Sequence, residues 1–190
     1  GLRWANTAWG LLKIKGIFEP VMRLFEAEKA DPKGKEAEIV RKVSAITGWD
    51  AEPASFALPL LTIGLGMDDM RETSGGNFYD NTAKVYGASI LSAEEAAALN
   101  KGVARIKGDD AGIAYMRQWH DARGNWKTPL VALHNGIDSL APYSQATQLR
   151  ERALAAGNAE HIALLTVPPL KLQLPFTTLD GYMHCGFRPQ

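Results

Sequence analysis

The sequence of 190 residues predicts an α/β fold in which a mainly helical region, residues 1–127, precedes a β-α-β segment, residues 128–190. Two observations support this prediction. Before residue 127 apolar side chains recur at helical spacing, and beyond Gly124 short apolar runs of strand length alternate with a helical segment. The change of pattern near residue 127 therefore predicts the main domain boundary.

Most of the first region has the spacing and the end signals of helices. Residues 4–28 predict two short helices, because Gly16 and Pro20 interrupt the apolar pattern. Residues 92–103 begin with the S-x-x-E pattern of a capping box, which predicts a helix from there on. Further helices are expected at 36–46, ended by Gly48, and at 109–119, whereas 53–65 fits either a helix or an extended segment.

Residues 128–190 predict a β-α-β unit. The apolar runs 129–133 and 161–167 have strand length, and the helical segment 144–156 between them ends at Gly157. A strand, a helix and a parallel strand form a right-handed crossover, the building unit of an α/β sheet. Two strands are too few for an independent sheet. Either the helical region covers this unit, or the missing strands belong to sequence outside this chain.

The balanced charge and the short apolar runs indicate which classes of partner are not expected. There are 21 basic and 21 acidic residues, so no net field attracts nucleic acid or an anionic membrane surface. The apolar run 56–65 is far shorter than the roughly 20 residues that a membrane-spanning helix needs. We therefore expect neither a nucleic-acid partner nor a membrane span.

The start of the chain and its cysteine favour a processed protein with a second chain. Gly1 is not an initiator Met, and the residues after it lack the basic-then-apolar layout of a signal peptide, which is typical of a processed or internal start. Cys185 is the single cysteine, so no disulfide can form within the chain. In a secreted protein such a cysteine is a candidate for a bond to another chain, and a free buried thiol is the alternative. We expect a periplasmic or secreted location, with a cytoplasmic one as the alternative.

Asp138 and His184 are the candidate catalytic residues. Asp138 ends the segment T-P-L-V-A-L-H-N-G-I-D, directly after a predicted strand, and His184 follows 46 positions later in Y-M-H-C-G-F. An acid on a loop after a strand, followed by a late histidine, is how an α/β-hydrolase presents the acid and base of its triad. The alternatives are an Asx-type turn for Asp138 and an exposed bystander for His184. The sequence contains no G-x-S-x-G elbow. The nucleophilic serine is therefore expected on an upstream segment or a partner chain.

Residues 128–187 resemble the C-terminal segment of an α/β-hydrolase of the serine esterase kind. Asp138-Ser-Leu-Ala-Pro142 is similar to the Asp-x-x-x-Pro segment of many hydrolases, and His184-Cys185 is similar to the tannase and feruloyl-esterase group. In that group a Cys beside the nucleophile bonds to a Cys beside the catalytic His; here the G-x-x-H-C spacing departs from the more common Gly-His arrangement. The resemblance implies that residues 1–127 form a helical cap or lid and that strands absent from this chain complete the sheet. It also implies no metal and no organic cofactor.

The segment S-G-G-N-F-Y-D-N, residues 74–81, is the most distinctive part of the first region. Its adjacent glycines allow a tight turn, and its polar and aromatic side chains could contact substrate, above all Asn77 and Tyr79. The alternative is a surface loop that satisfies its own backbone. We also interpret His134 as a structural residue, because a histidine at a strand end does not share a helical face with Asp138 as a metal-binding pair would.

These features predict a serine hydrolase acting on small carboxylic esters. This chain would supply Asp138 and His184, and a heterodimer made by proteolytic processing would supply the serine. Two alternatives stay open: an amidase or peptidase with the same triad, and a non-catalytic interaction module that retains half of a hydrolase architecture.

Overall fold

The computed structural model describes residues 4–173, 180–184 and 186–187. It is a mixed structure of helices and a few short strands, as an α/β composition predicts. The chain divides into two compact units. The first, called here the helical unit, consists of Gly1–Thr47 and Leu60–Asp121, and the second, the strand unit, consists of Gly48–Pro59 and Ala122–Gln190. Both candidate catalytic residues belong to the strand unit.

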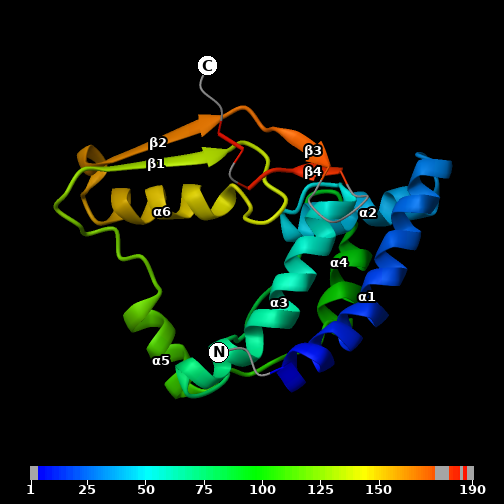
Figure 1. Cartoon of the computed structure of the whole chain (residues 1–190), viewed down its shortest axis with the longest axis horizontal. Helices are drawn as coiled ribbons and strands as arrows, with labels where there is room; N and C mark the ends of the chain where they lie inside the picture. Colours follow the sequence, from blue (N-terminus) through cyan, green and yellow to red (C-terminus); the bar gives the residue numbers. More distant parts are fainter. Residues whose placement is uncertain (1–3, 174–179, 185, 188–190) are drawn as a thin grey trace. The chain divides into compact units, whose positions relative to one another are not determined.

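The helical unit is built from helices joined by loops (Figure 1). Helix α1 packs against α2, and Ala37 and Val40 of α2 are buried together with Phe25 of α1. Side chains three positions apart lie on the same face of a helix, so α2 presents both residues to its neighbour. The helices are α1 (Trp4–Ala30), α2 (Lys35–Thr47), α3 (Pro53–Ser74), α4 (Ala93–Gly102) and α5 (Asp110–Trp119). Residues 53–59 of α3 belong to the strand unit and the rest of α3 to the helical unit.

One helix, α1, covers the stretch for which the sequence predicts two. That prediction is wrong because Pro20 lies inside the helix rather than between helices. A proline removes a single hydrogen bond, here the one to the carbonyl of Gly16, and its ring bends the helix without necessarily ending it. The sequence does not decide between a helix and an extended segment for residues 53–65. In the structure these residues are helical and form the first part of α3, with Pro59 inside the helix.

The other helix ends follow their local signals. Gly48 ends α2 with a φ of 75°, in the left-handed region that glycine adopts without steric cost. The capping box of α4 is formed in both directions, since Glu95 N donates to Ser92 Oγ at 3.2 Å and Ser92 N donates to Glu95 Oε2 at 2.9 Å. These two predictions are confirmed.

The strand unit contains the predicted β-α-β element. Strands β1 (Leu130–Asn135) and β2 (Ile162–Val167) pair in parallel, with Leu133 opposite Leu165 and Asn135 opposite Val167. Helix α6 (Ser144–Ala155) connects them through the short helix η1 (Ala159–His161) and packs against β2. Figure 1 shows α6 running along one face of the pair. Because β1 and β2 are parallel, their carboxyl ends share one edge of the sheet, where Asp138 follows β1.

The sheet face opposite α6 is apolar and exposed. Side chains alternate between the two faces of a strand, so Val131 and Leu133 lie on one face together with Leu165 of β2. Their exposed fractions are 64%, 44% and 51%. Tyr143, directly before α6, contacts the other face, where its hydroxyl hydrogen-bonds Thr166 at 2.6 Å. The exposed face and its three apolar side chains are called here the open face.

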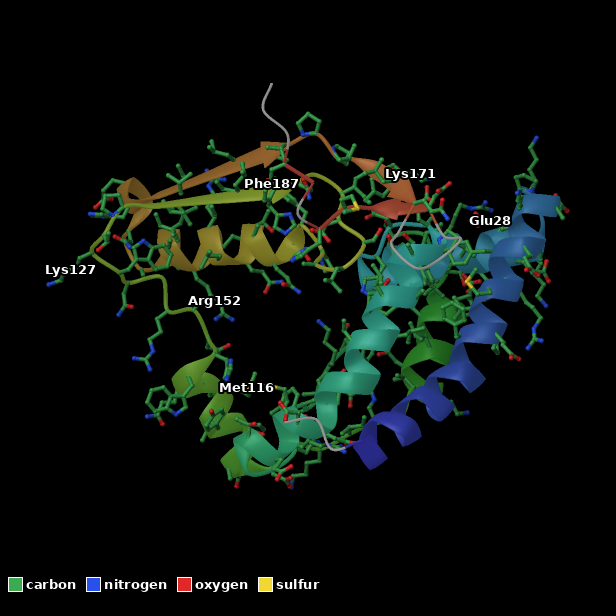
Figure 2. All side chains as sticks on the ribbon, in the orientation of Figure 1. Glu28, Met116, Lys127, Arg152, Lys171 and Phe187 are labelled. Carbon is green, nitrogen blue, oxygen red and sulfur yellow. The ribbon has the colours of Figure 1, made fainter. Side chains whose placement is uncertain are left out.

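A second pair of strands carries the candidate histidine. Strands β3 (Lys171–Gln173) and β4 (Asp180–Tyr182) are antiparallel, and His184 follows β4 by two residues. The segment 48–59 contacts this part of the strand unit, because Lys171, labelled on β3 in Figure 2, donates to Glu52 Oε1 at 2.8 Å. The start of α3 is thereby bound to the strands around the site.

The entry into β1 is bound to the end of α6 at Gly124. Gly124 has a φ of 73°, and a Cβ there would lie 2.3 Å from the carbonyl oxygen of Arg152. Asn158, which is buried, donates to the carbonyls of Gly124 at 2.9 Å and Trp126 at 2.7 Å. Arg152, labelled on α6 in Figure 2, donates to the carbonyl of Ala122 at 2.9 Å. These contacts hold residues 122–126, which precede β1, against the end of α6.

We expect Gly124→Ala to destabilise the chain by several kcal/mol, because the methyl group collides with backbone rather than with a flexible side chain. Gly157→Ala is the matched control: its φ is 72°, yet a Cβ there meets nothing within 4 Å. The control should cost only the left-handed conformation, about 1–2 kcal/mol. Urea unfolding of both variants measures the difference. Equal losses would contradict the close approach of residues 122–126 to α6.

Candidate functional site

The Asp138 carboxylate is buried and uses both of its oxygens. It lies on the loop after β1, and its side chain is 1% exposed. Oδ1 accepts hydrogen bonds from the backbone N–H groups of Leu140 at 2.8 Å and Ala141 at 2.9 Å. This is the Asx-type turn that the sequence leaves as an alternative. It fixes one oxygen to the backbone and leaves Oδ2 free to meet a second group.

That second group is His184. Its Nδ1 lies 2.8 Å from Asp138 Oδ2, although 46 residues separate the two in the sequence. A carboxylate can only accept, so Nδ1 carries the hydrogen and a neutral imidazole presents its lone pair at Nε2. The His184 side chain is 49% exposed, and Nε2 has no hydrogen-bond partner in the described part of the chain. The structure therefore brings the two predicted residues together, with one ring nitrogen fixed and the other open.

Polar side chains that the sequence analysis missed hold the histidine loop beside Asp138. Asn135 at the end of β1 donates from Nδ2 to the carbonyls of Met183 at 2.6 Å and His184 at 3.1 Å. Ser139 exchanges two bonds with Tyr182: Ser139 N donates to Tyr182 O at 3.2 Å, and Tyr182 N donates to Ser139 Oγ at 2.8 Å. Both residues flank Asp138 in the sequence. That proximity was the available signal, but nothing in the sequence tells which of the neighbouring polar groups faces the histidine loop.

Ser55 and Asp50 bring the segment 48–59 into the site. Ser55 Oγ donates to Ser139 Oγ at 3.0 Å, and both residues are 1% exposed. Burial raises the pKa of the Asp50 carboxyl, and the negative charges of Glu52 and Asp138 raise it further. Lys171 bonds to Glu52, one of these three carboxylates, and this bond raises the pKa of the lysine ammonium. The site is thus an acidic one in which Lys171 compensates part of the charge.

Asn77 and Tyr79, the candidate substrate contacts, belong to the helical unit and are engaged within it. The Asn77 amide donates to the carbonyls of Tyr79 at 3.0 Å and Lys107 at 2.8 Å. The Tyr79 hydroxyl lies 3.0 Å from that of Tyr86, and the residue is 42% exposed. The Asn77 contacts match the alternative of a loop that satisfies its own backbone. A substrate role for either residue stays a prediction.

Asp80, in the segment 74–81, accepts three hydrogen bonds. Its Oδ1 accepts from the hydroxyl of Thr82 at 2.6 Å and from the Thr82 N–H at 2.9 Å, and its Oδ2 accepts from Gly108 N at 2.9 Å. These bonds, first the one from the Thr82 hydroxyl, lower the pKa of Asp80 to about 2. Asp80 therefore fastens the loop to the segment before α5.

Cys185 lies outside the described residues, and its expected bond to another chain stays a prediction. His134 is placed: its Nδ1 lies 2.8 Å from the carbonyl of Asn135, and its ring meets that of Tyr143 at 5.6 Å. Among the described residues, no group of three or more His, Cys, Asp and Glu side chains could hold a metal ion. Of the described helices, none combines the length and the apolar character needed to cross a membrane.

Comparisons with known proteins found no relative of the chain: no family model, no curated protein and no solved structure matches it. The function is therefore argued from the residues themselves, above all from the Asp138–His184 pair and the loops that hold it.

The carboxylates predict opposite effects of pH on two matched variants. The pKa of Asp50 is raised in the folded chain, so its contribution to stability is present below its ordinary value of 3.8 and is lost as the pH rises through the folded value. Asp50→Asn should therefore gain stability relative to the native chain as the pH rises from 3 to 7. Asp80 has a lowered pKa, so it stabilises the fold above 3.8 and loses this effect as the pH falls towards about 2. Asp80→Asn should accordingly lose stability at pH 7.

Urea unfolding of the native chain and of both variants at several pH values measures these differences. As the pH falls both differences from the native chain should shrink, that of Asp50→Asn below pH 3.8 and that of Asp80→Asn only as the pH approaches about 2. A native carboxyl that is protonated in both the folded and the unfolded state no longer contributes to the difference. A loss of stability at pH 7 in Asp50→Asn would contradict the repulsion that we assign to Asp50, Glu52 and Asp138.

Proposed function

We propose that the chain is part of a serine hydrolase acting on carboxylic esters, for which it supplies the acid and the base of the triad. The observation that carries the proposal is the 2.8 Å contact between His184 Nδ1 and the buried Asp138 Oδ2, with the opposite ring edge exposed. A general base needs this combination, because one nitrogen must be oriented and the other must reach the substrate side.

The mechanism assigns one task to each residue. His184 Nε2 takes the proton of a serine hydroxyl while the serine oxygen attacks the ester carbonyl, and the imidazolium then gives that proton to the leaving alkoxide. Asp138 keeps the ring in the Nδ1–H tautomer and stabilises the imidazolium. Water then attacks the acyl-enzyme with His184 again as the base, which releases the acid and restores the serine. The backbone amides that stabilise the oxyanion lie outside this chain, because they accompany the serine.

Residues outside this chain carry the serine, on an upstream segment or on a second polypeptide. Two observations support this part of the proposal. The sequence holds no G-x-S-x-G elbow, and within the described residues β1 and β2 form a sheet of two strands with an open face. Parallel sheets are ordinarily covered on both faces, and a pair of strands is at best marginal alone. A polypeptide that covers Val131, Leu133 and Leu165 would remove an apolar surface from water.

An amide-cleaving enzyme with the same pair is the second candidate, since peptidases and amidases use the same residues. p-Nitrophenyl esters and p-nitroanilides tested side by side separate the two. A non-catalytic module that retains the pair is the third, and the variants below distinguish it from both enzymes.

We expect His184→Ala to lower ester turnover by several orders of magnitude and Asp138→Asn to lower it by about 10⁴-fold, because the asparagine holds the wrong tautomer. His120→Ala is the matched control, since His120 is an exposed histidine of the helical unit. The protein is assayed together with any polypeptide that copurifies, and a fluorophosphonate probe with peptide mapping identifies the reactive serine. Probe labelling at an unchanged rate in His184→Ala would sink the proposal.

The open face gives a separate test of the partner. Leu133→Glu should abolish association with the serine-bearing polypeptide, because it places a charge on the surface that is to be covered. Leu154→Glu on α6 is the control, since Leu154 is 45% exposed against 44% for Leu133. Size-exclusion chromatography with intact-mass analysis shows which polypeptides remain together. Full esterase activity in a homogeneous sample of this chain alone would contradict the proposal that the serine lies outside this chain.

A further inference from the structure

We propose that Asn135 and Ser139 are positioning residues, which set the place of His184 relative to Asp138 by holding the backbone of the histidine loop. The inference rests on the proposed function for its catalytic meaning, but the geometry that it concerns is measurable without any enzyme activity. Neither residue touches the imidazole or would touch a substrate; both act through the backbone of residues 182–184.

The need for such residues follows from the exposure of His184. About half of its side chain lies in solvent, so packing against neighbours does not hold the ring. The place of the ring then depends on where the backbone of residues 182–184 lies. A general base tolerates little error in that place, since a displacement of about 1 Å can cost about 10²-fold in rate.

Asn135 holds the two carbonyls closest to the imidazole. Its amide donates to Met183 O and His184 O, and the residue is 0% exposed. Its own position is fixed, because it is the last residue of β1 and is paired with Val167 of β2. The end of β1 thus holds the histidine loop through the side chain of Asn135.

The contribution of Asn135 comes from the N–H groups of its amide. Asn135 Oδ1 is buried and finds no hydrogen-bond partner within the described residues. A buried acceptor without a donor is unfavourable, whereas the two bonds from Nδ2 satisfy the carbonyls of Met183 and His184. What the amide provides is therefore this pair of bonds to the histidine loop.

Ser139 holds the same loop from the other side of Asp138. Its backbone N–H and its Oγ bond both the carbonyl and the N–H of Tyr182, as in a short strand pairing. The Ser55 hydroxyl donates to the same Oγ and directs it towards Tyr182. Since Asn135 precedes Asp138 by three residues and Ser139 follows it directly, the carboxylate and the histidine loop share their anchors.

The matched pair Ser139→Ala and Ser55→Ala separates positioning from general stability. Each variant removes one buried hydroxyl of the same hydrogen bond. Only Ser139→Ala also removes the acceptor of the Tyr182 N–H, whereas Ser55→Ala leaves both Ser139–Tyr182 bonds in place.

The readout is nuclear magnetic resonance of the full chain, together with any polypeptide that copurifies. The ¹⁵N shifts of the imidazole report the Nδ1–H tautomer, and the exchange of the Nδ1 proton with water reports its bond to Asp138. Asp138→Asn defines the signal of the broken pair. We expect Ser139→Ala to accelerate exchange of this proton by about ten-fold, the order that the loss of a hydrogen bond implies, and Ser55→Ala to leave it unchanged. The Tyr182 amide should be protected in the native chain and in Ser55→Ala, and lose protection in Ser139→Ala.

Asn135→Leu gives the independent variant, because leucine has the same number and branching of side-chain heavy atoms as asparagine and lacks the amide. We expect it to fold and to lose the Nδ1 proton signal of the native pair. The inference is overturned by a native signal in folded Ser139→Ala or Asn135→Leu, by an equal change in Ser55→Ala, or by an unprotected Tyr182 amide in the native chain. The protection of the Tyr182 amide in the native chain tests the inference even where a variant does not fold.

The resonance measurements and the turnover assay test the two proposals separately. Where ester turnover is measurable, Ser139→Ala should lower kcat and leave KM unchanged, since the serine contacts no substrate. Absence of all turnover would remove the hydrolase proposal and leave the resonance result to stand on its own as a statement about the loop.

Discussion

A buried carboxylate that must be satisfied is the constraint on which the strand unit depends. Asp138 is removed from water after β1, and an unpartnered charge there would cost several kcal/mol. Two backbone N–H groups of its own loop satisfy Oδ1, and no group of that loop is found on Oδ2. A donor from elsewhere in the chain must therefore reach Oδ2, and His184 is that donor. The antiparallel pairing of β3 with β4 and the bonds to Tyr182, Met183 and His184 bring this donor into place.

Strands β1 and β2, most of the helices and the two candidate catalytic residues could be predicted from the sequence because their signals are local, whereas the short strands β3 and β4 were not predicted. Apolar runs define β1 and β2, Gly157 follows α6, and Asp138 and His184 occur in the order that a triad requires. Proline was the misleading local signal. Pro20 predicts a break where the helix continues, since the loss of one hydrogen bond is small beside the bonds on either side and the packing of α1 against α2.

The anchors of the site could not be predicted, because they depend on contacts between residues far apart in the sequence. Ser55 lies 84 positions before Ser139, and nothing around it in the sequence differs from an ordinary helix start. Asn135 looks like the polar end of a strand until its bonds to residues 183 and 184 are known. The raised pKa of Asp50 likewise arises from burial and from carboxylates brought near by the fold. A sequence pattern thus indicates candidate catalytic residues more readily than the residues that hold them in place.

The two alternatives for Asp138, a turn residue or a triad acid, are compatible because a carboxylate has two oxygens. A carboxylate held by one oxygen to a turn has a fixed orientation, so its second oxygen points in one direction. That fixed direction is what an imidazole needs in order to be held in one tautomer. The Asx turn of Asp138 is thus compatible with the proposed role as triad acid. The same reasoning applies to the exposure of His184: a ring held at Nδ1 and half exposed to solvent has the arrangement that the proposed role as base requires.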